Sequence, residues 1–154
     1  MRWIVRLFKV LVVAVGIILT AIVVVKTYGW VHWFLLPPAE RLLVEADDLA
    51  DKANWKAAAR LYRQAERLFH QGGNAAFELY AKASQIPAQT ESSLQPMSEW
   101  LAQVDQLLSL PAARDPKAQL RLLEIKSQVE NNYDATLAFK TWTTVEQMAA
   151  QQHT

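Results

Sequence analysis

The longest apolar stretch of the chain lies close to its N-terminus. Residues 10–25 read VLVVAVGIILTAIVVV, 16 residues without a charge. A membrane-spanning helix needs roughly 20 apolar residues, and the stretch reaches that length if Lys9 or Lys26 extends its ammonium group toward the lipid headgroups. We therefore predict a transmembrane helix over about residues 7–28, within an N-terminal anchor of residues 1–36.

Aromatic residues stand at both ends of this apolar stretch. Trp3 precedes it, and Tyr28, Trp30 and Trp33 follow it. Amphipathic rings favour the boundary between lipid and water, so their placement agrees with a membrane helix. The segment 28–36 either continues the helix or lies along the membrane surface.

The charges around the stretch predict its orientation. Arg2, Arg6 and Lys9 precede it and only Lys26 follows, which places the N-terminus in the cytoplasm by the positive-inside rule. The rest of the chain would then lie outside the inner (cytoplasmic) membrane, in the periplasm of a Gram-negative cell. A cleaved signal peptide is the alternative, but the bulky residues of segment 23–28 do not resemble its small-residue cleavage site.

From Pro37 onward the apolar residues follow the helical period. They recur at i, i+3 and i+4, without the alternation that strands show. The pattern predicts an all-α domain over residues 37–154, with six antiparallel helices arranged as three stacked hairpins. The predicted helices cover residues 39–52, 55–71, 74–84, 97–110, 116–130 and 133–151.

Turn residues separate these helices. Gly72 and Gly73 are suited to ending a helix, and Asp115 before Pro116 is suited to beginning one. Residues 85–95 (QIPAQTESSLQ) are polar, and we expect an irregular loop there. Large side chains are expected to fill the core: Trp55, Tyr62, Leu68, Trp100, Leu120, Leu123, Phe139 and Trp142.

Residues 39–72 resemble one tetratricopeptide repeat, a hairpin of two helices that is 34 residues long. Ala46 stands where the first helix of such a unit needs a small residue, and Trp55 resembles the aromatic residue that opens the second. Ala58, Tyr62 and Ala65 match the small–aromatic–small spacing of that second helix. One departure is His70, which stands where a proline often closes the unit in the family. The resemblance implies a stack of hairpins that binds other proteins.

By the same resemblance, one face of the first helix would line a groove for a partner peptide. Five residues would form this predicted partner groove: Glu40, Leu43, Asp47, Ala50 and Asp51. With Glu45 and Asp48, the acidic residues of this helix favour a basic or polar peptide. The simpler interpretation of the acidic cluster is a solvated helix face, because no calcium-binding loop follows it.

Charge is distributed unevenly along the chain. The first 36 residues carry +4, and the remainder has 12 basic and 15 acidic residues, a net charge of −3. An acidic body does not favour nucleic-acid binding, which requires a basic surface to neutralise phosphates. The chain has no cysteine, so thiol nucleophiles, disulfides and thiolate metal sites are excluded.

Two features of the anchor suggest contacts within the membrane. His32 lies among interfacial aromatic residues, where it could ligate a haem or a pigment or simply rest at the headgroups. Gly16 and Thr20 form a small-residue strip suited to packing against another membrane helix. His32 is the one candidate ligand, and we predict that the protein holds no cofactor.

No catalytic motif is recognisable, since the serines lack a nucleophile elbow and no glycine-rich phosphate loop exists. The sequence therefore predicts a non-enzymatic, membrane-anchored scaffold, an accessory subunit or assembly factor that binds membrane proteins of a larger complex. The alternative is a structural subunit of a photosynthetic or respiratory complex whose membrane helix packs against the core of that complex.

Overall fold

The computed structural model describes residue 20, residues 35–132 and residues 134–152. The chain divides into two units, Met1–Pro37 and Pro38–Thr154. Most of the predicted membrane helix, with Gly16, lies outside the described residues, and so does His32, while Thr20 is described as helical. No helix of the described part is long and apolar enough to cross a membrane.

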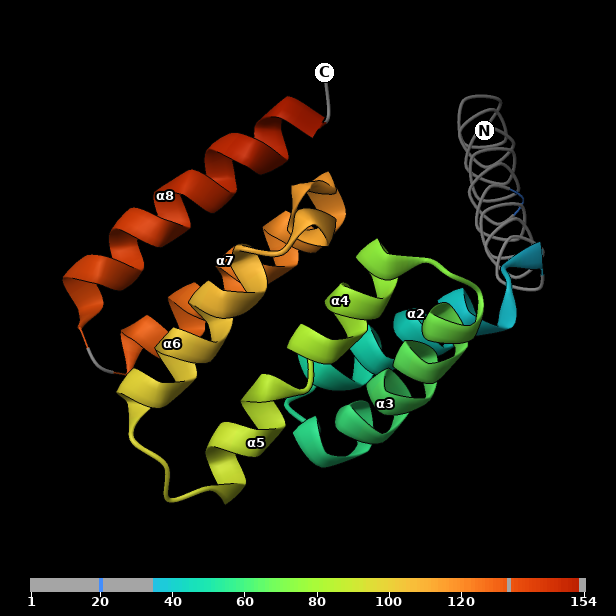
Figure 1. Ribbon diagram of the computed structural model, residues 1–154, viewed down its shortest axis with the longest axis horizontal. Coiled ribbons are helices and arrows are strands. Elements are labelled where there is room, and N and C mark those ends of the chain that lie inside the picture. The colour runs from blue at the N-terminus through green and yellow to red at the C-terminus, as the bar shows by residue number, and fades with distance from the viewer. Residues whose placement is uncertain (1–19, 21–34, 133, 153–154) are drawn as a thin grey trace, which may run out of the picture. The chain divides into compact units, whose positions relative to one another are not determined.

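The described part of the second unit consists of helices joined by short turns (Figure 1). Its elements in chain order are α2 (Pro38–Asp51), α3 (Trp55–Gln71), α4 (Ala75–Ala83), α5 (Ile86–Ser92), α6 (Met97–Leu108), the 3₁₀ helix η1 (Pro111–Arg114), α7 (Pro116–Asn131) and α8 (Ala135–Gln152). The prediction of an all-α domain is confirmed for these residues, because they contain no strand.

All six predicted helices are present among the described residues, and a further helix, α5, occupies part of the segment expected to be a loop. That expectation was wrong for two reasons. Pro87 stands in the first turn of α5, where its missing N–H is not needed. Ile86 has only 1% of its surface exposed, so the segment is held against the core despite its polar composition.

Local residues explain where several helices begin. The side chain of Asp115 accepts hydrogen bonds from the backbone N–H groups of Lys117 (3.0 Å) and Ala118 (3.2 Å), so its predicted role at the start of α7 is confirmed. Asn74 does the same for α4 by accepting from the N–H of Phe77 at 3.2 Å. These bonds satisfy donors that have no partner inside the helix.

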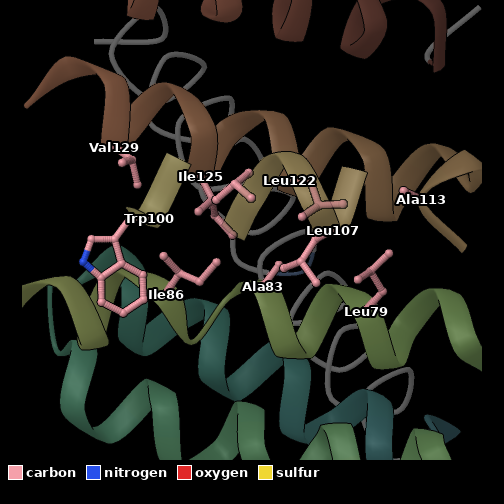
Figure 2. Packing of buried hydrophobic residues seen from close by; sticks show 10 residues of the cluster. Leu79, Ala83, Ile86, Trp100, Leu107, Ala113, Leu122, Ile125 and Val129 are labelled. Carbon is pink, nitrogen blue, oxygen red and sulfur yellow. The ribbon is translucent and has the colours of Figure 1, made fainter. Parts of the chain in front are cut away.

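The larger hydrophobic cluster lies between α7 on one side and α4, α5 and α6 on the other. Figure 2 shows Leu122, Ile125 and Val129 of α7 directed toward the side chains beneath them. The remaining buried members of this cluster are Leu79, Ala83, Ile86, Trp100, Val104, Leu107 and Ala113.

A second cluster lies between α2, α3 and α4. It is built mainly from alanines around two aromatic rings: Leu43, Ala46, Ala50, Ala58, Tyr62, Ala65, Phe69 and Ala81. Ala46 and Ala58 lie almost entirely out of solvent contact, and such small side chains allow two helix backbones to approach closely. Helix α4 contributes to both clusters and therefore joins the two halves of the domain.

The helices pair partly as expected. Helix α2 packs extensively on α3, and α7 packs extensively on α8, as the first and last predicted hairpins require. The middle pair differs, because α4 contacts α3 and α7 far more extensively than it contacts α6. Helix α6 instead packs mainly on α7.

The last helix buries less of its surface than its sequence predicts. Phe139 and Trp142, both expected in the core, are 72% and 44% exposed. The reason is that α8 packs chiefly on α7 and buries only a narrow face, which includes Ala138 and Val145.

Three leucines also differ from the predicted core. Leu68 is 38% exposed near the end of α3. In α7 the deeply buried leucine is Leu122, whereas Leu120 and Leu123 on its flanks are half-buried. The buried face of α7 is therefore rotated slightly from the one that its apolar pattern indicates.

A matched pair of substitutions tests the two turns that use left-handed backbone. Ala53 has φ of 56° and Gly73 has φ of 69°, and a side chain at Gly73 would meet no atom within 4 Å. An L-residue is strained in this region by about 1–2 kcal/mol, partly offset by the lower entropy of an unfolded chain with alanine. We expect Ala53→Gly to raise the free energy of unfolding by about 0.5–1 kcal/mol and Gly73→Ala to lower it by a similar amount.

Thermal unfolding of the full-length protein in one mild detergent, followed by circular dichroism of the helical signal, measures both changes. Changes of the same sign in the two variants would contradict these turn conformations.

Candidate functional site

A polar network lies where α2, α3 and α4 meet. The carboxylate of Asp47 accepts a hydrogen bond from the phenol of Tyr62 at 2.6 Å and a second from the phenol of Tyr80 at 3.0 Å. The three residues come from three different helices, and Tyr62 is fully buried. Both oxygens of the carboxylate are therefore engaged with partners distant in sequence.

Arg121 of α7 completes this network. Its guanidinium donates to the phenol of Tyr62 (3.0 Å) and to the hydroxyl of Ser84 (2.8 Å), and it also donates to Glu124 at 3.2 Å. It lies 3.8 Å from the carboxylate of Asp47, as an ion pair, and its side chain is only 15% exposed. We call the six residues that take part the Arg121 network: Asp47, Tyr62, Tyr80, Ser84, Arg121 and Glu124.

The guanidinium also lies over two aromatic rings. Its central carbon is 5.9 Å from the ring centroid of Tyr62 and 5.5 Å from that of Tyr80. A cation over a ring face is attracted by the negative face of the ring. The two phenols thus hold the cation through their rings while donating their protons to Asp47.

Burial raises the pKa of both phenols above the ordinary value of 10.0. The Arg121 cation acts in the opposite direction, and the carboxylate of Asp47 adds to the increase. Both phenols therefore remain protonated at neutral pH and serve as donors. Because the hydroxyl protons and the cation have partners, the arrangement stabilises the junction of four helices rather than presenting a reactive group.

The predicted partner groove is not an open surface in this structure. Leu43 and Ala50 are buried in the cluster between α2 and α3. Asp47 belongs to the Arg121 network, Glu40 is half-buried, and Asp51 is exposed at the end of α2. The structure therefore does not bring these five residues together on one accessible face.

A cleft of about 470 Å³ lies between α3 and α5, and we call it the basic cleft. Its cations are Lys56, Arg60 and Arg63, and the only carboxylate among its lining residues is Glu91. The full lining is Lys56, Ala59, Arg60, Arg63, Gln85, Ala88, Gln89 and Glu91. None of the three cations forms a hydrogen bond or an ion pair through its side chain within the described part of the chain.

Two further depressions adjoin the basic cleft, one beside the other. A middle depression of about 280 Å³ shares Glu91 with the basic cleft and is lined by Trp55, Pro87, Thr90, Glu91, Gln128, Val129, Asn131 and Asn132. The third, of about 340 Å³, lies between α7 and α8 and shares Gln128 and Asn131 with the middle one. Because each depression shares lining residues with the next, the three are neighbours. They run from α3 and α5, past the end of α7, to the groove between α7 and α8.

We call the third depression the aromatic groove. Its lining contains no charged side chain and consists of Ser127, Gln128, Asn131, Ala135, Ala138, Phe139 and Trp142. Beside it, a hydrogen bond of 2.6 Å joins the hydroxyl of Thr141 in α8 to the buried carboxylate of Glu130 in α7. The two exposed rings thus stand on a helix that is firmly attached to the domain.

Sequence reasoning overlooked the basic cleft, although a signal existed. Lys56, Arg60, Arg63 and Arg67 are spaced at i, i+4, i+7 and i+11, which places them on one helix face. The cleft itself could not be predicted, because its second wall is α5. Among the described residues, no group of three or more histidine or acidic side chains is arranged to hold a metal ion.

No protein-family model, curated protein or solved structure matches this chain.

The Arg121 network predicts a loss of stability in alkali. Below pH 10.0 the phenols are protonated in both the folded and the unfolded states, and their contribution is fully present. Above that value the unfolded phenols ionise while the folded ones retain their protons, so the free energy of unfolding falls by up to about 1.4 kcal/mol per pH unit for each phenol.

Tyr80→Phe separates this effect from general alkaline unfolding. At neutral pH the variant should be about 1 kcal/mol less stable, because one hydrogen bond to Asp47 is lost. Above the ordinary phenol pKa, its stability should fall less steeply than that of the wild type, since one of the two phenols whose pKa is raised in the folded state is gone. Thermal unfolding across the neutral to alkaline range measures both effects, and parallel curves for the two proteins would contradict the raised phenol pKa.

Proposed function

We propose that this protein is a membrane-tethered, non-enzymatic interaction domain, an accessory subunit or assembly factor that binds another membrane protein. The observation that carries the proposal is the aromatic groove. Phe139 and Trp142 are exposed on the last helix, although aromatic side chains supply much of the core burial that a domain of this size needs. Exposed aromatic residues on a rigid support are typical of protein interfaces.

The chemistry of the groove favours one kind of occupant. No charged residue lines it, and the carboxylate of Glu146, which accepts a hydrogen bond from the indole of Trp142 at 3.1 Å, disfavours an acidic segment, which would lose its hydration there without gaining a counter-charge. The amides of Gln128 and Asn131 supply donors and acceptors beside the two rings. A neutral amphipathic helix of the partner, packed between α7 and α8, fits this combination.

The resemblance to a tetratricopeptide unit is part of the proposal. It is supported by the burial of the residues that carry it, since Ala46, Ala58, Tyr62 and Ala65 all lie in the cluster between α2 and α3. A stack of hairpins is completed when its last helix is covered. In our proposal, the partner helix covers α8 in that way.

The membrane tether is supported by the sequence of residues 7–28 and by the charges around it. In the proposed arrangement the N-terminus is cytoplasmic and the helical domain lies on the outer side of the inner membrane. A tether restricts the domain to the membrane surface and raises its effective concentration toward membrane partners.

Single introduced cysteines test this topology, because the chain has none of its own. Ala102→Cys places a thiol at an exposed position of α6. Trp3→Cys places one before the apolar stretch and keeps all the cations on which the predicted orientation depends. A membrane-impermeant maleimide should label Ala102→Cys in spheroplasts and should label Trp3→Cys only after lysis. The reverse pattern would place the domain in the cytoplasm.

A photo-crosslinking residue in place of Phe139 tests the aromatic groove in native membranes. We expect a crosslink to one membrane protein, and adding Trp142→Ser should weaken that complex at least about tenfold, because an aromatic hot-spot residue contributes about 2 kcal/mol or more. The same photo-crosslinking residue in place of the fully exposed Leu94 is the control and should give no crosslink. A crosslink only to a second copy of this chain would contradict a heterologous partner.

A further inference from the structure

The basic cleft has features that the aromatic groove does not share. Its cations belong to a row on α3 formed by Lys56, Arg60, Arg63 and Arg67, and all four residues are exposed. Within the described residues, none of the four has a hydrogen-bonded or ionic side-chain partner. Like charges at i, i+4 destabilise a helix, so a row of cations without ion-pair partners is unfavourable in the free protein.

The second wall of the cleft adds a hydrogen-bond acceptor, the side-chain carbonyl of Gln85. Gln85 is buried, and its amide nitrogen donates to Glu66 at 2.6 Å and to the carbonyl of Ala81 at 3.2 Å. These bonds hold the side chain in place at the cleft, while its side-chain carbonyl oxygen has no partner in the described part. An extended peptide needs such acceptors for its N–H groups.

From this combination we infer that the basic cleft binds an acidic, extended segment of the partner protein, an inference that rests on the proposed function. Four cations over about eleven residues of helix span about 16 Å at a rise of about 1.5 Å per residue. An extended chain covers that distance with about five residues at roughly 3.3 Å each. The segment therefore carries two or more carboxylates within about five or six residues.

Other anionic partners fit this surface less well. A lipid bilayer is flat, whereas three of the four cations line a cleft of about 470 Å³ between α3 and α5, which lie side by side (Figure 1). A nucleic acid would extend beyond the cleft over a chain portion whose net charge is −3. A short acidic segment stays within the cleft, where three cations outnumber the single carboxylate, that of Glu91.

The position of the cleft agrees with a partner that also occupies the aromatic groove. The basic cleft shares Glu91 with the middle depression, which in turn shares Gln128 and Asn131 with the aromatic groove. One partner chain could therefore place an acidic segment against α3 and an apolar helix against α8. The acidic segment would then fix the direction in which the partner binds.

Fluorescence anisotropy with a fluorescein-labelled hexaglutamate peptide tests the inference on the full-length protein in a mild detergent. We expect Arg60→Glu with Arg63→Glu to weaken peptide binding at least about tenfold, because two cations become repulsive. The matched control is Arg114→Glu with Lys140→Glu, which changes the net charge equally at exposed cations of η1 and α8. This control should alter peptide affinity less than about twofold, because a distant exposed charge is screened by salt. Both double variants should keep the helical circular dichroism of the wild type.

Equal losses in the two double variants would overturn the inference, because net charge alone would then explain binding. The inference would also be overturned if a single-stranded DNA hexamer or phosphatidylglycerol vesicles bound more tightly than the peptide and if that binding were lost in Arg60→Glu with Arg63→Glu. The photo-crosslink at Phe139 is scored separately. If the crosslink forms but hexaglutamate binds both double variants equally, the acidic-segment inference fails and the proposed function stands. If no crosslink forms but hexaglutamate distinguishes the two double variants, the function assigned to the aromatic groove is overturned.

Discussion

The buried guanidinium of Arg121 organises the helical domain. Removing this cation from water is costly unless it finds hydrogen bonds and counter-charges. Glu124 on the same helix supplies one counter-charge. The other partners, Asp47, Tyr62 and Ser84, reach the guanidinium only when α2, α3 and α4 are assembled, since they come from α2, from α3 and from the end of α4. The network therefore favours one arrangement of these helices over other compact packings of the same apolar faces.

That constraint explains how a domain with two separate clusters behaves as one unit. The alanine-rich cluster on α2 and α3 and the larger cluster under α7 both include residues of α4. The Arg121 network crosses the same boundary by hydrogen bonds instead of apolar contact. Because α7 carries α8 and forms part of the aromatic groove, the network also fixes where the two exposed rings stand relative to α3.

The two surfaces proposed to bind a partner differ in physical character. The aromatic groove offers apolar area without charge, which favours affinity through burial, whereas the basic cleft offers charge, which favours orientation and rapid association. Both depend on helices that are attached to the core, so a partner would meet preformed surfaces. A tether to the membrane would reduce the entropy cost of that encounter further.

The sequence by itself determined the helical class, six of the helices and the turn residues such as Asp115, because these depend on periodicity and on local hydrogen bonds. Only the tertiary structure decided which apolar residues are covered. Phe139 and Trp142 have the spacing of core residues, yet α7 covers only one face of α8, and Ile86 is buried within a polar segment. Burial and the meeting of Arg121 with Asp47 depend on helices distant in sequence, and a local pattern carries no information about which neighbour lies opposite.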